Sequence, residues 1–374
     1  MNSAPLTDLA RALPASVPFR SPEWDERERG APFRARLGAN ENLFGPSPAA
    51  AEAMARAAGA AWKYGDATCH DLREALAGHL DVPPAHIGIG PGIDGLLGWL
   101  VRLTVAPGAA VVTSDGAYPT FNYHVTGFGG ALHKVPYRGD AEDIAGLTDA
   151  ARRTGARLVY LCNPDNPMGS HHPGPAIART LDDLPAGTLL VLDEAYGAFA
   201  PEGTLPAIDP ADPRVIRMRS FSKAYGLAGA RVGYAIGPAD LIAAFERVRD
   251  HFVMTRMSLA GAEAALEDRT WLSDMLRRTD AARRRIGAIA RENGLTPLPS
   301  ATNFVAVDCG AGGAFARHVL AAMKARGVFL RMPQAPPGDR CIRVTAGPDA
   351  ALDIFAAELP AALADARDAP AAAG

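Results

Sequence analysis

The chain has 374 residues, of which 48% are hydrophobic and 21% charged, and its formal net charge is −3. This length suits one large and one smaller domain, and the composition excludes a disordered or fibrous protein. The slightly negative charge argues against binding to nucleic acid or to an anionic membrane surface, so a small-molecule partner is expected.

The four cysteines, Cys69, Cys162, Cys309 and Cys341, lie far apart and form neither a CxxC pair nor a disulfide ladder. We therefore expect reduced, structural thiols in a cytoplasmic protein. The N-terminus lacks the basic start and apolar stretch of a signal peptide, and no window reaches the roughly 18 apolar residues that span a bilayer. The sequence predicts no association with a membrane.

In chain order, residues 1–35 are rich in proline and charge, and they are predicted to form an arm. Over residues 36–255, short apolar runs alternate with amphipathic stretches, which is typical of a parallel sheet flanked by helices. This is the predicted large domain. Its clearest strands are expected at His86–Gly90, Ala110–Ser114, Arg157–Leu161, Leu189–Leu192, Val215–Arg219 and Val232–Ile236.

Residues 256–366 are predicted to form a smaller α+β domain, and residues 367–374 a frayed tail. The domain begins with a long helical region, Leu259–Asn293. Pro360 is expected to end the last helix, because proline lacks the backbone N–H that a helix needs. The strands are predicted at Phe304–Val307, Val328–Arg331 and Cys341–Thr345, and the later helices at Gly313–Arg326 and Asp349–Leu359.

The segment Gly90–Gly95 matches the pattern GxGxxG between a predicted strand and a predicted helix, and Asp115 ends the next strand. This local arrangement is that of a dinucleotide-binding turn, so an NAD-dependent oxidoreductase is one hypothesis. The pattern is permissive in a chain with 38 glycines. In either case, the free N–H groups at the start of the helix are suited to a phosphate.

The segment from Ser220 to Arg231 follows an apolar strand and is dense in small residues that let a ligand approach the backbone. Lys223 can form a Schiff base with an aldehyde and then move a proton as acid and base. Ser220, Ser222 and Arg231 together can clamp a phosphate. An isolated SxSK pattern is more often a solvated lysine in a glycine-rich loop, so the neighbouring motifs must decide.

Other polar residues follow strands that end at the same edge of the sheet. Asp193 ends an apolar strand, where a carboxylate can keep a pyridine nitrogen protonated, and Tyr196 can reach a ring hydroxyl. Tyr118 offers a ring that can stack on a planar cofactor, and an Asn-Pro turn presents the Asn166 amide. Taken singly, these residues are equally explained by a helix cap, core packing or a turn.

The order of the motifs is more specific than any one of them: Ala39-Asn-Glu-Asn42, Tyr64-Gly-Asp, the glycine-rich turn, Tyr118-Pro-Thr, Asn163-Pro-Asp-Asn-Pro, Asp193-Glu-Ala-Tyr and Ser222-Lys-Ala-Tyr-Gly-Leu-Ala-Gly-Ala-Arg. From about Leu37 to Thr345 the chain resembles the fold-type I, class I/II aminotransferases, with the histidinol-phosphate aminotransferases as the closest pattern. The resemblance implies an α/β fold with a mainly parallel seven-stranded sheet domain, a smaller α+β domain and the cofactor pyridoxal 5′-phosphate (PLP).

The resemblance also implies a role for each matching residue. Lys223 would be the Schiff-base lysine, Asp193 the partner of the pyridine nitrogen, and Arg343, Arg331 and Asn42 would bind the substrate. The remaining implied cofactor contacts are Asn166 and Tyr196 to the ring oxygen, Tyr118 stacked on the ring, and Ile93, Asp94, Ser220, Ser222, Arg231 and the Tyr64 of a second subunit to the phosphate. The expected assembly is therefore a homodimer.

The expected reaction is ping-pong transamination from histidinol phosphate or an aromatic amino acid to 2-oxoglutarate. A PLP-dependent decarboxylase or lyase similar to threonine-phosphate decarboxylase is the alternative.

Phe19 stands near where the family often has a tyrosine that touches the substrate phosphate. Arg256 is either a substrate contact or a surface charge. The pair His171-His172 lacks partners at metal spacing, and no metal is predicted.

Overall fold

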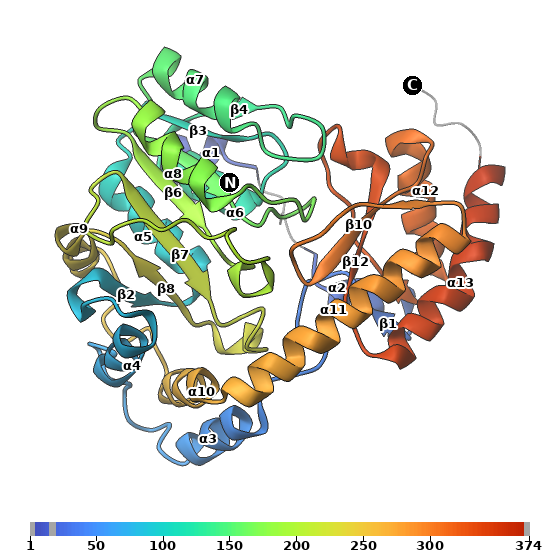
Figure 1. Ribbon diagram of the computed structural model, residues 1–374, viewed down its shortest axis with the longest axis horizontal. Coiled ribbons are helices and arrows are strands. Elements are labelled where there is room, and N and C mark those ends of the chain that lie inside the picture. The colour runs from blue at the N-terminus through green and yellow to red at the C-terminus, as the bar shows by residue number, and fades with distance from the viewer. Residues whose placement is uncertain (1–3, 15–19, 370–374) are drawn as a thin grey trace.

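The computed structural model describes residues 4–14 and 20–369, and its ribbon shows two domains side by side (Figure 1). Within these residues, the larger domain contains a seven-stranded sheet in which β8 runs antiparallel to both of its neighbours. The other pairings are parallel, which confirms the predicted fold class. Across the sheet, the strands are β2 (Ile87–Gly90), β8 (Gly233–Ile236), β7 (Val215–Ser220), β6 (Leu189–Asp193), β5 (Leu158–Cys162), β3 (Ala110–Ser114) and β4 (Ala131–Val135).

β4 forms one edge of this sheet, and it is the strand that the sequence does not reveal. It pairs with β3 alone, and its residues are half-buried except for the exposed Lys134 and the buried Val135. A strand of this kind, which also carries His133, lacks the continuous apolar run by which strands covered on both faces are recognised.

Helices cover both faces of the large sheet. They are α3 (Pro48–Ala58), α4 (His70–Leu80), α5 (Gly92–Thr104), α6 (Pro119–Gly127), α7 (Ile144–Thr154), α8 (Gly174–Asp183), α9 (Ala239–Ala244) and α10 (Arg256–Glu267). Alternate residues of a strand pack against opposite layers. In β6, Val191 belongs to the core shared with α5 and α6, whereas Leu190 and Leu192 belong to the core shared with α7 and α8. The rigid sheet therefore fixes where its strand ends lie.

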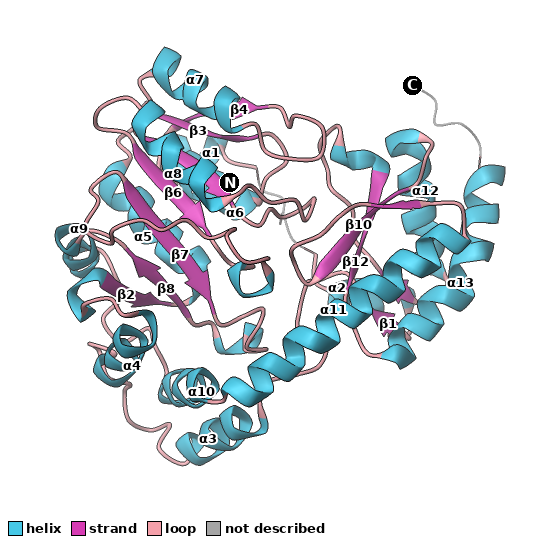
Figure 2. Cartoon of the chain, viewed as in Figure 1, coloured by secondary structure: helices cyan, strands magenta, loops and turns pink. Residues whose placement is uncertain are grey.

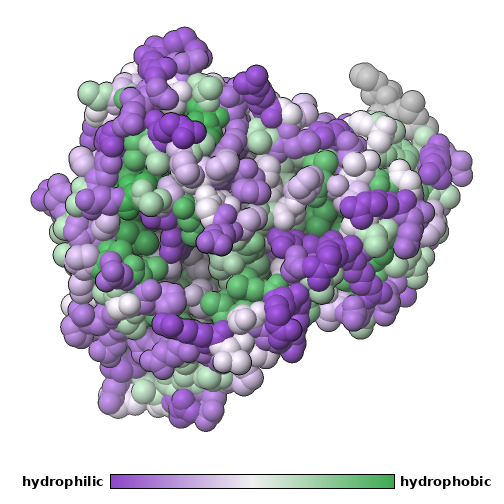
Figure 3. Space-filling view, viewed as in Figure 1, coloured by the Kyte–Doolittle hydropathy of each residue, from purple (hydrophilic) through white to green (hydrophobic). Residues whose placement is uncertain are grey.

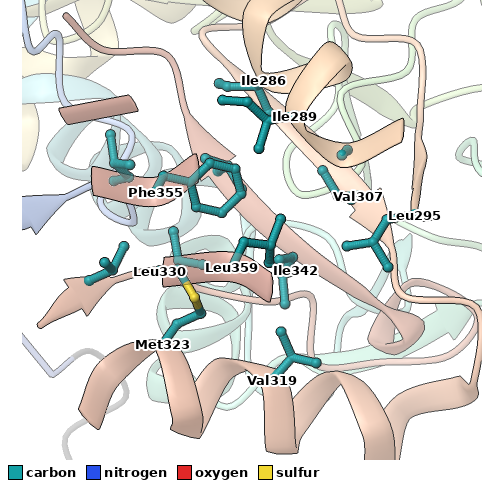
Figure 4. Packing of buried hydrophobic residues seen from close by; sticks show 14 of the residues in the cluster. Ile286, Ile289, Leu295, Val307, Val319, Met323, Leu330, Ile342, Phe355 and Leu359 are labelled. Carbon is teal, nitrogen blue, oxygen red and sulfur yellow. The ribbon is translucent and has the colours of Figure 1, made fainter. Parts of the chain in front are cut away.

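The smaller domain places helices around two short sheets (Figure 2). Its strands are β12 (Cys341–Thr345), β10 (Phe304–Asp308) and β9 (Thr296–Pro297) in one antiparallel sheet, and β1 (Ala35–Arg36) with β11 (Val328–Phe329) in a parallel pair. Its helices are α11 (Arg269–Glu292), α12 (Gly312–Ala325) and α13 (Asp349–Asp368). In the core, Ile286 of α11, Met323 of α12, Ile342 of β12 and Phe355 of α13 come together (Figure 4).

The last helix does not end at Pro360 but continues through it to Asp368, so that prediction is wrong. The proline removes one helical hydrogen bond. Beyond it, Ala362, Leu363 and Ala366 are all buried in the core of the small domain. The apolar surface that these residues bury offsets the missing hydrogen bond, so residues 367 and 368, which were predicted to belong to a frayed tail, are still helical.

The long helical region predicted at Leu259–Asn293 is divided into α10 and α11. Asp268 lies between the two helices, and its side chain accepts a hydrogen bond of 3.0 Å from the backbone N–H of Trp271. An aspartate that caps a helix N-terminus in this way stops one helix and begins the next. Figure 1 shows α11 running from the large domain to the small one.

The N-terminal segment holds two helices, α1 (Asp8–Ala12) and α2 (Pro22–Arg29). α2 lies against the small domain, where Asp25 forms an ion pair of 2.8 Å with Lys324.

Hydrophilic residues cover much of the visible surface, and hydrophobic ones show mainly in patches between the outer elements (Figure 3). None of the described helices is both long and apolar enough to cross a membrane.

Candidate active site

The carboxyl ends of β5, β6 and β7 meet at one edge of the large sheet. The chain that follows these strands carries Asn166, Asp193 and Lys223. Ligands of α/β proteins bind at this edge of the sheet. The small domain completes the site, because Arg343 of β12 donates a hydrogen bond of 2.6 Å to the side-chain oxygen of Asn166.

Lys223 lies in the loop that follows β7, and its ammonium nitrogen is 5.9 Å from the centroid of the Tyr196 ring. Burial, together with the nearby charge of Arg343, lowers the pKa of Lys223 to about 8. Near neutral pH the uncharged amine, the form that attacks an aldehyde carbon, is therefore a larger fraction of this lysine than of an ordinary exposed one.

Asp193 is buried at the end of β6, and two donors hold its carboxylate. The Tyr160 hydroxyl donates to Oδ2 at 2.7 Å, and the backbone N–H of Ala195 donates to Oδ1 at 2.9 Å. Burial raises the pKa of Asp193 to about 6. A carboxylate in this setting is stabilised by a cationic partner such as a protonated ring nitrogen.

The sequence analysis missed Tyr160, although a signal was available. Tyr160 is the one polar side chain in the aliphatic part of strand β5, and it stacks on Phe121 with ring centroids 4.6 Å apart. A buried tyrosine hydroxyl usually has a hydrogen-bond partner, so its position two residues before the end of the strand pointed to an acceptor near the site.

Tyr196 is buried between the two domains, and its position depends on a second residue that the sequence analysis did not single out. The side-chain amide of Asn40 donates a hydrogen bond of 3.0 Å to the Tyr196 hydroxyl oxygen. Asn40 is in turn held by Thr345, whose hydroxyl contacts both its backbone N–H and its side-chain oxygen. Phe304 packs edge-on against the Tyr196 ring.

A cup for a phosphate lies at the N-terminus of α5, where the backbone N–H groups of Ile93 and Asp94 have no intrahelical partners. Arg231 lies beside it and contacts the Ser222 hydroxyl at 3.3 Å and Asp94 at 3.5 Å. The Ser220 hydroxyl accepts from the N–H of Ser222 at 2.9 Å. Each group predicted to surround the phosphate within this chain is therefore part of one cluster or borders it.

Glycine is required at position 92, next to this cup. Its φ is +75°, and a Cβ atom there would lie 2.5 Å from a terminal nitrogen of Arg231. Tyr118 lies close by, with its hydroxyl 3.4 Å from Asp94. A helix N-terminus, an arginine and a close-packed glycine form a cradle that fits a phosphate group, and Lys223, Asp193 and Tyr196 fit an aldehyde-bearing pyridine ring beside it. The residues present therefore fit PLP.

Two arginines of the small domain lie together at the opposite side of the site. The backbone N–H of Arg343 donates to the carbonyl oxygen of Arg331 at 2.6 Å. Burial, with Arg331 adding to it, lowers the pKa of Arg343 to about 10, and its buried Nε has no hydrogen-bond partner. A charged, partly unsatisfied guanidinium of this kind is suited to an anionic group of a substrate.

The remaining predicted residues have other surroundings. Asn42 donates to the carbonyl oxygen of Ala224 at 3.2 Å and so holds the backbone next to Lys223. Tyr64 is 75% exposed on the surface and stacks on Phe252 with ring centroids 4.6 Å apart. Arg256 begins α10 and is exposed, and Phe19 lies outside the described residues.

The comparisons with known proteins agree with this geometry. The family described as aminotransferase class I and II matches residues 35–359. The histidinol-phosphate aminotransferase of Moorella thermoacetica is 32% identical over 335 residues, covering 88% of this chain and 86% of its own length. The aromatic amino acid aminotransferase of Nocardia farcinica is 37% identical over 352 residues, covering 90% and 91%.

Among solved structures, the histidinol-phosphate aminotransferase from Sinorhizobium meliloti in complex with pyridoxal-5′-phosphate is 50% identical, with a TM-score of 0.93. The match covers 97% of this chain and 98% of that one. These findings overturn the dinucleotide interpretation of Gly90–Gly95, and Asp115, which belonged to that pattern, lies 3.3 Å from Lys134 in an ion pair. The chain belongs to the class I and II aminotransferase family.

Proposed function

We propose that the protein moves an amino group from histidinol phosphate to a 2-oxo acid such as 2-oxoglutarate, with the two substrates bound in turn. As a class I and II aminotransferase, it is a PLP enzyme. When bound, PLP supplies an aldehyde that reacts with amines and a pyridinium ring that accepts the electron pair released at the substrate Cα. The protein supplies binding, orientation and proton transfer.

In this proposal, Lys223 is the amine that holds the cofactor and then carries the proton. Its lowered pKa of about 8 makes the neutral amine more accessible than in an ordinary lysine, and this amine can accept a proton from the substrate Cα once it is released. Asp193 keeps a proton on the ring nitrogen, because an ionised, buried carboxylate favours a positive partner. Tyr196, supported by Asn40, donates to the ring oxygen.

The observation that carries the substrate assignment is the adjacent pair Arg331 and Arg343. Both guanidinium groups have lowered pKa values, chiefly because of burial, so two positive charges lie close together in a partly desolvated part of the site. A phosphate dianion satisfies two such groups better than a single carboxylate does. The 50% identical structure from Sinorhizobium meliloti is described as a histidinol-phosphate aminotransferase, which supports the same choice.

An aromatic amino acid is the second candidate donor. Its support is the Nocardia farcinica relative, which is 37% identical over nearly the whole chain. Arg343 alone would then bind the substrate carboxylate, and the aromatic ring would lie against apolar side chains of the site. The two candidates differ in their need for Arg331.

A half-reaction screen tests the proposal. The holoenzyme is mixed with histidinol phosphate, phenylalanine or tyrosine, and loss of the cofactor's visible absorbance is followed. We expect the fastest loss with histidinol phosphate, and an Arg331→Ala variant should lose that reaction at least tenfold more than the reaction with phenylalanine. Release of carbon dioxide without an amino acceptor would instead identify a decarboxylase.

Reduction with borohydride followed by peptide mapping tests the role of Lys223. A pyridoxyl label on Lys223 is expected, and a label on another lysine would overturn the assignment.

We also propose that the enzyme is a homodimer in which Tyr64 of each subunit reaches the cofactor phosphate of the other. The four buried, unpaired cysteines are consistent with a role in the cytoplasm, where thiols stay reduced.

A further inference from the structure

Two acidic side chains are buried together behind the Asn163–Gly169 turn, and the proposed chemistry uses neither of them. Glu142 and Asp165 are each 2% exposed. Their carboxyl groups lie within hydrogen-bonding reach of each other. A hydrogen bond between two carboxyl groups requires a proton on one of them, because an ionised carboxylate can only accept.

The remaining oxygen contacts of the pair come from neutral donors. Asp165 accepts from the Tyr137 hydroxyl at 2.8 Å and from the N–H of Met168 at 2.9 Å. Glu142 accepts from the Ser114 hydroxyl at 2.5 Å and from the N–H of Cys162 at 2.9 Å. In the described part of the chain, neither carboxyl group forms an ion pair with a basic side chain, although the charge of Arg343 acts on Asp165, so a shared proton would limit the negative charge of the pair.

The electrostatics assign the proton to Glu142. Burial and the neighbouring Asp165 raise the pKa of Glu142 well above its usual range. Burial also raises the pKa of Asp165, but only to about 6, because hydrogen bonds from Met168 and Tyr137 and the charge of Arg343 oppose the effect of burial. At neutral pH the pair therefore holds one proton and one negative charge.

Asp165 is also the residue that closes the turn. Its N–H donates to the carbonyl oxygen of Ser170 at 2.8 Å, and its own carbonyl oxygen accepts from the N–H of Gly169 at 3.1 Å. The next residue, Asn166, accepts the 2.6 Å hydrogen bond from Arg343. A displacement of the Asp165 side chain would therefore move the acceptor that orients Arg343.

Glu142 holds the far side of the same turn through its backbone. Its carbonyl oxygen contacts Nε2 of His172 at 2.9 Å, and the N–H of His172 donates to the side-chain oxygen of Asn163 at 2.8 Å. The Asn163 end of the turn is therefore tied to Glu142 through His172. Asp140, two residues before Glu142, accepts a hydrogen bond of 2.6 Å from Arg340 and so links this region to the small domain.

We propose that Glu142 and Asp165 share one proton and that this carboxyl pair positions the turn that carries Asn166. Through Asn166, the pair sets the orientation of Arg343 toward an anionic substrate. This inference rests on the proposed transamination site for its effect on catalysis, but not for the existence of the shared proton. Both acids are positioning residues, since neither contacts the reacting atoms.

Loss of the shared proton would place two negative charges in contact in a buried site, and they would separate. The turn would then shift and weaken substrate binding, so KM should rise at alkaline pH while kcat changes less. The titratable or charged groups that face the pair are Tyr137 from the loop after β4, Tyr160 and Cys162 from β5, His172 from the loop before α8, and Arg343 from β12.

Infrared difference spectroscopy tests the shared proton without substrate. The wild-type protein should show the carbonyl stretch of a protonated, buried carboxyl group at neutral pH, and Glu142→Gln should lack it. Asp165→Asn should also lack it, because the new amide can donate to an ionised Glu142. A wild-type spectrum without this band would overturn the proposal, whether or not the enzyme transaminates any candidate substrate.

Steady-state kinetics test the positioning role. Glu142→Ala should raise KM for 2-oxoglutarate about tenfold and change kcat by less than about threefold, as expected for the loss of one charge-assisted hydrogen bond. Glu142→Gln should restore KM, since its amide donates to Asp165 without titrating, and it should also abolish the alkaline rise in KM. If KM in Glu142→Ala equals that of the wild type, the pair does not position the site.

Thermal unfolding covers the case in which Glu142→Ala does not fold. Both acids have raised pKa values, so their contribution to stability is present at low pH and is lost as pH rises, first through about 6 for Asp165 and then through the higher pKa of Glu142. Above pH 6, Glu142→Gln should lose less stability with rising pH than the wild type. Identical pH dependence in the two proteins would contradict the shared proton.

Discussion

Asn40 and Tyr196 lie 156 positions apart in the chain, and yet the Asn40 amide donates a hydrogen bond of 3.0 Å to the Tyr196 hydroxyl oxygen. This contact joins the segment that enters the small domain to the edge of the large sheet. Burial raises the pKa of Tyr196. The hydrogen bond from Asn40 opposes this rise, because it stabilises negative charge on the phenol oxygen. Asn40 should therefore influence catalysis through its contact with Tyr196.

Asn40→Gly tests this contact. Asn40 has a φ of 56°, a conformation that glycine and asparagine adopt easily and alanine does not. Asn40→Gly should lower kcat/KM about tenfold through the lost hydrogen bond, with little change in folding. Asn40→Ala should show the same loss of activity plus about 1 kcal/mol of destabilisation, measured by urea unfolding. Equal activity in Asn40→Gly and the wild type would remove Asn40 from the site.

Asp193→Asn should stabilise the protein without cofactor while abolishing useful activity. The pKa of Asp193 is raised to about 6, so in the absence of a positive partner its effect on stability is favourable at low pH and is lost as pH rises from about 4 to 6. At pH 7, Asp193→Asn should therefore raise the free energy of unfolding of the apoprotein by about 3 kcal/mol. Its kcat/KM should fall at least 100-fold.

Denaturant unfolding of the apoproteins at pH 4 and pH 7 checks this expectation. The difference between Asp193→Asn and the wild type should be much smaller at pH 4, where the wild-type carboxyl group is also neutral. A wild-type apoprotein that is the more stable of the two at pH 7 would show that other partners satisfy the Asp193 charge.

Gly92→Ala should weaken PLP binding. The added Cβ atom would lie 2.5 Å from Arg231, and alanine is strained at a φ of +75°. Displacing the arginine removes a charge-assisted contact, so the dissociation constant should rise 10–100-fold, on the order of 1.5–3 kcal/mol. Equilibrium dialysis with PLP measures it.

A matched control for this substitution is Gly78→Ala. Gly78 lies inside α4, and an added Cβ atom meets nothing within 4 Å. Alanine there should leave PLP affinity unchanged and stabilise the protein by roughly 0.5–1 kcal/mol. If both variants keep wild-type affinity, the cup at the start of α5 does not hold the phosphate.

Mixing two inactive variants tests whether Tyr64 acts across subunits. Lys223→Ala and Tyr64→Ala should each lose most activity as separate proteins. If the two chains exchange freely, half of the dimers are mixed, and each mixed dimer contains one site with both Lys223 and Tyr64 intact, which restores about a quarter of wild-type activity. No recovery, with mixed dimers demonstrated by differential tags, would place Tyr64 outside the partner's site.

The parts of the fold that the sequence predicts are those governed by local pattern. Strands such as Leu189–Asp193 are continuous apolar runs, and the loop from Ser220 to Arg231 carries its chemistry in adjacent residues. The edge strand Ala131–Val135 was missed because half-exposed residues carry no such run. Pro360 misled the prediction because burial of the residues beyond it, rather than local propensity, decides where that helix ends.

The parts of the site that the sequence does not reveal are contacts between distant segments. Asn40 and Asn42 belong to the same short motif, yet Asn40 contacts Tyr196 and Asn42 holds the backbone beside Lys223. Which of the two asparagines contacts Tyr196 depends on the hydrogen bonds between Thr345 of the small domain and Asn40. No spacing rule within the motif contains that information.

The reversed direction of β8 has a consequence for which cofactors the enzyme accepts. Because β8 is antiparallel, its first residue, Gly233, pairs with Ser220 on one side and with Gly90 on the other. The loop between β7 and β8 therefore carries both Lys223 and Arg231, the residues proposed to hold the aldehyde and the phosphate of the cofactor. If a residue is added to this loop or removed from it, the distance between these two side chains should change, and a longer or shorter aldehyde phosphate should then be favoured.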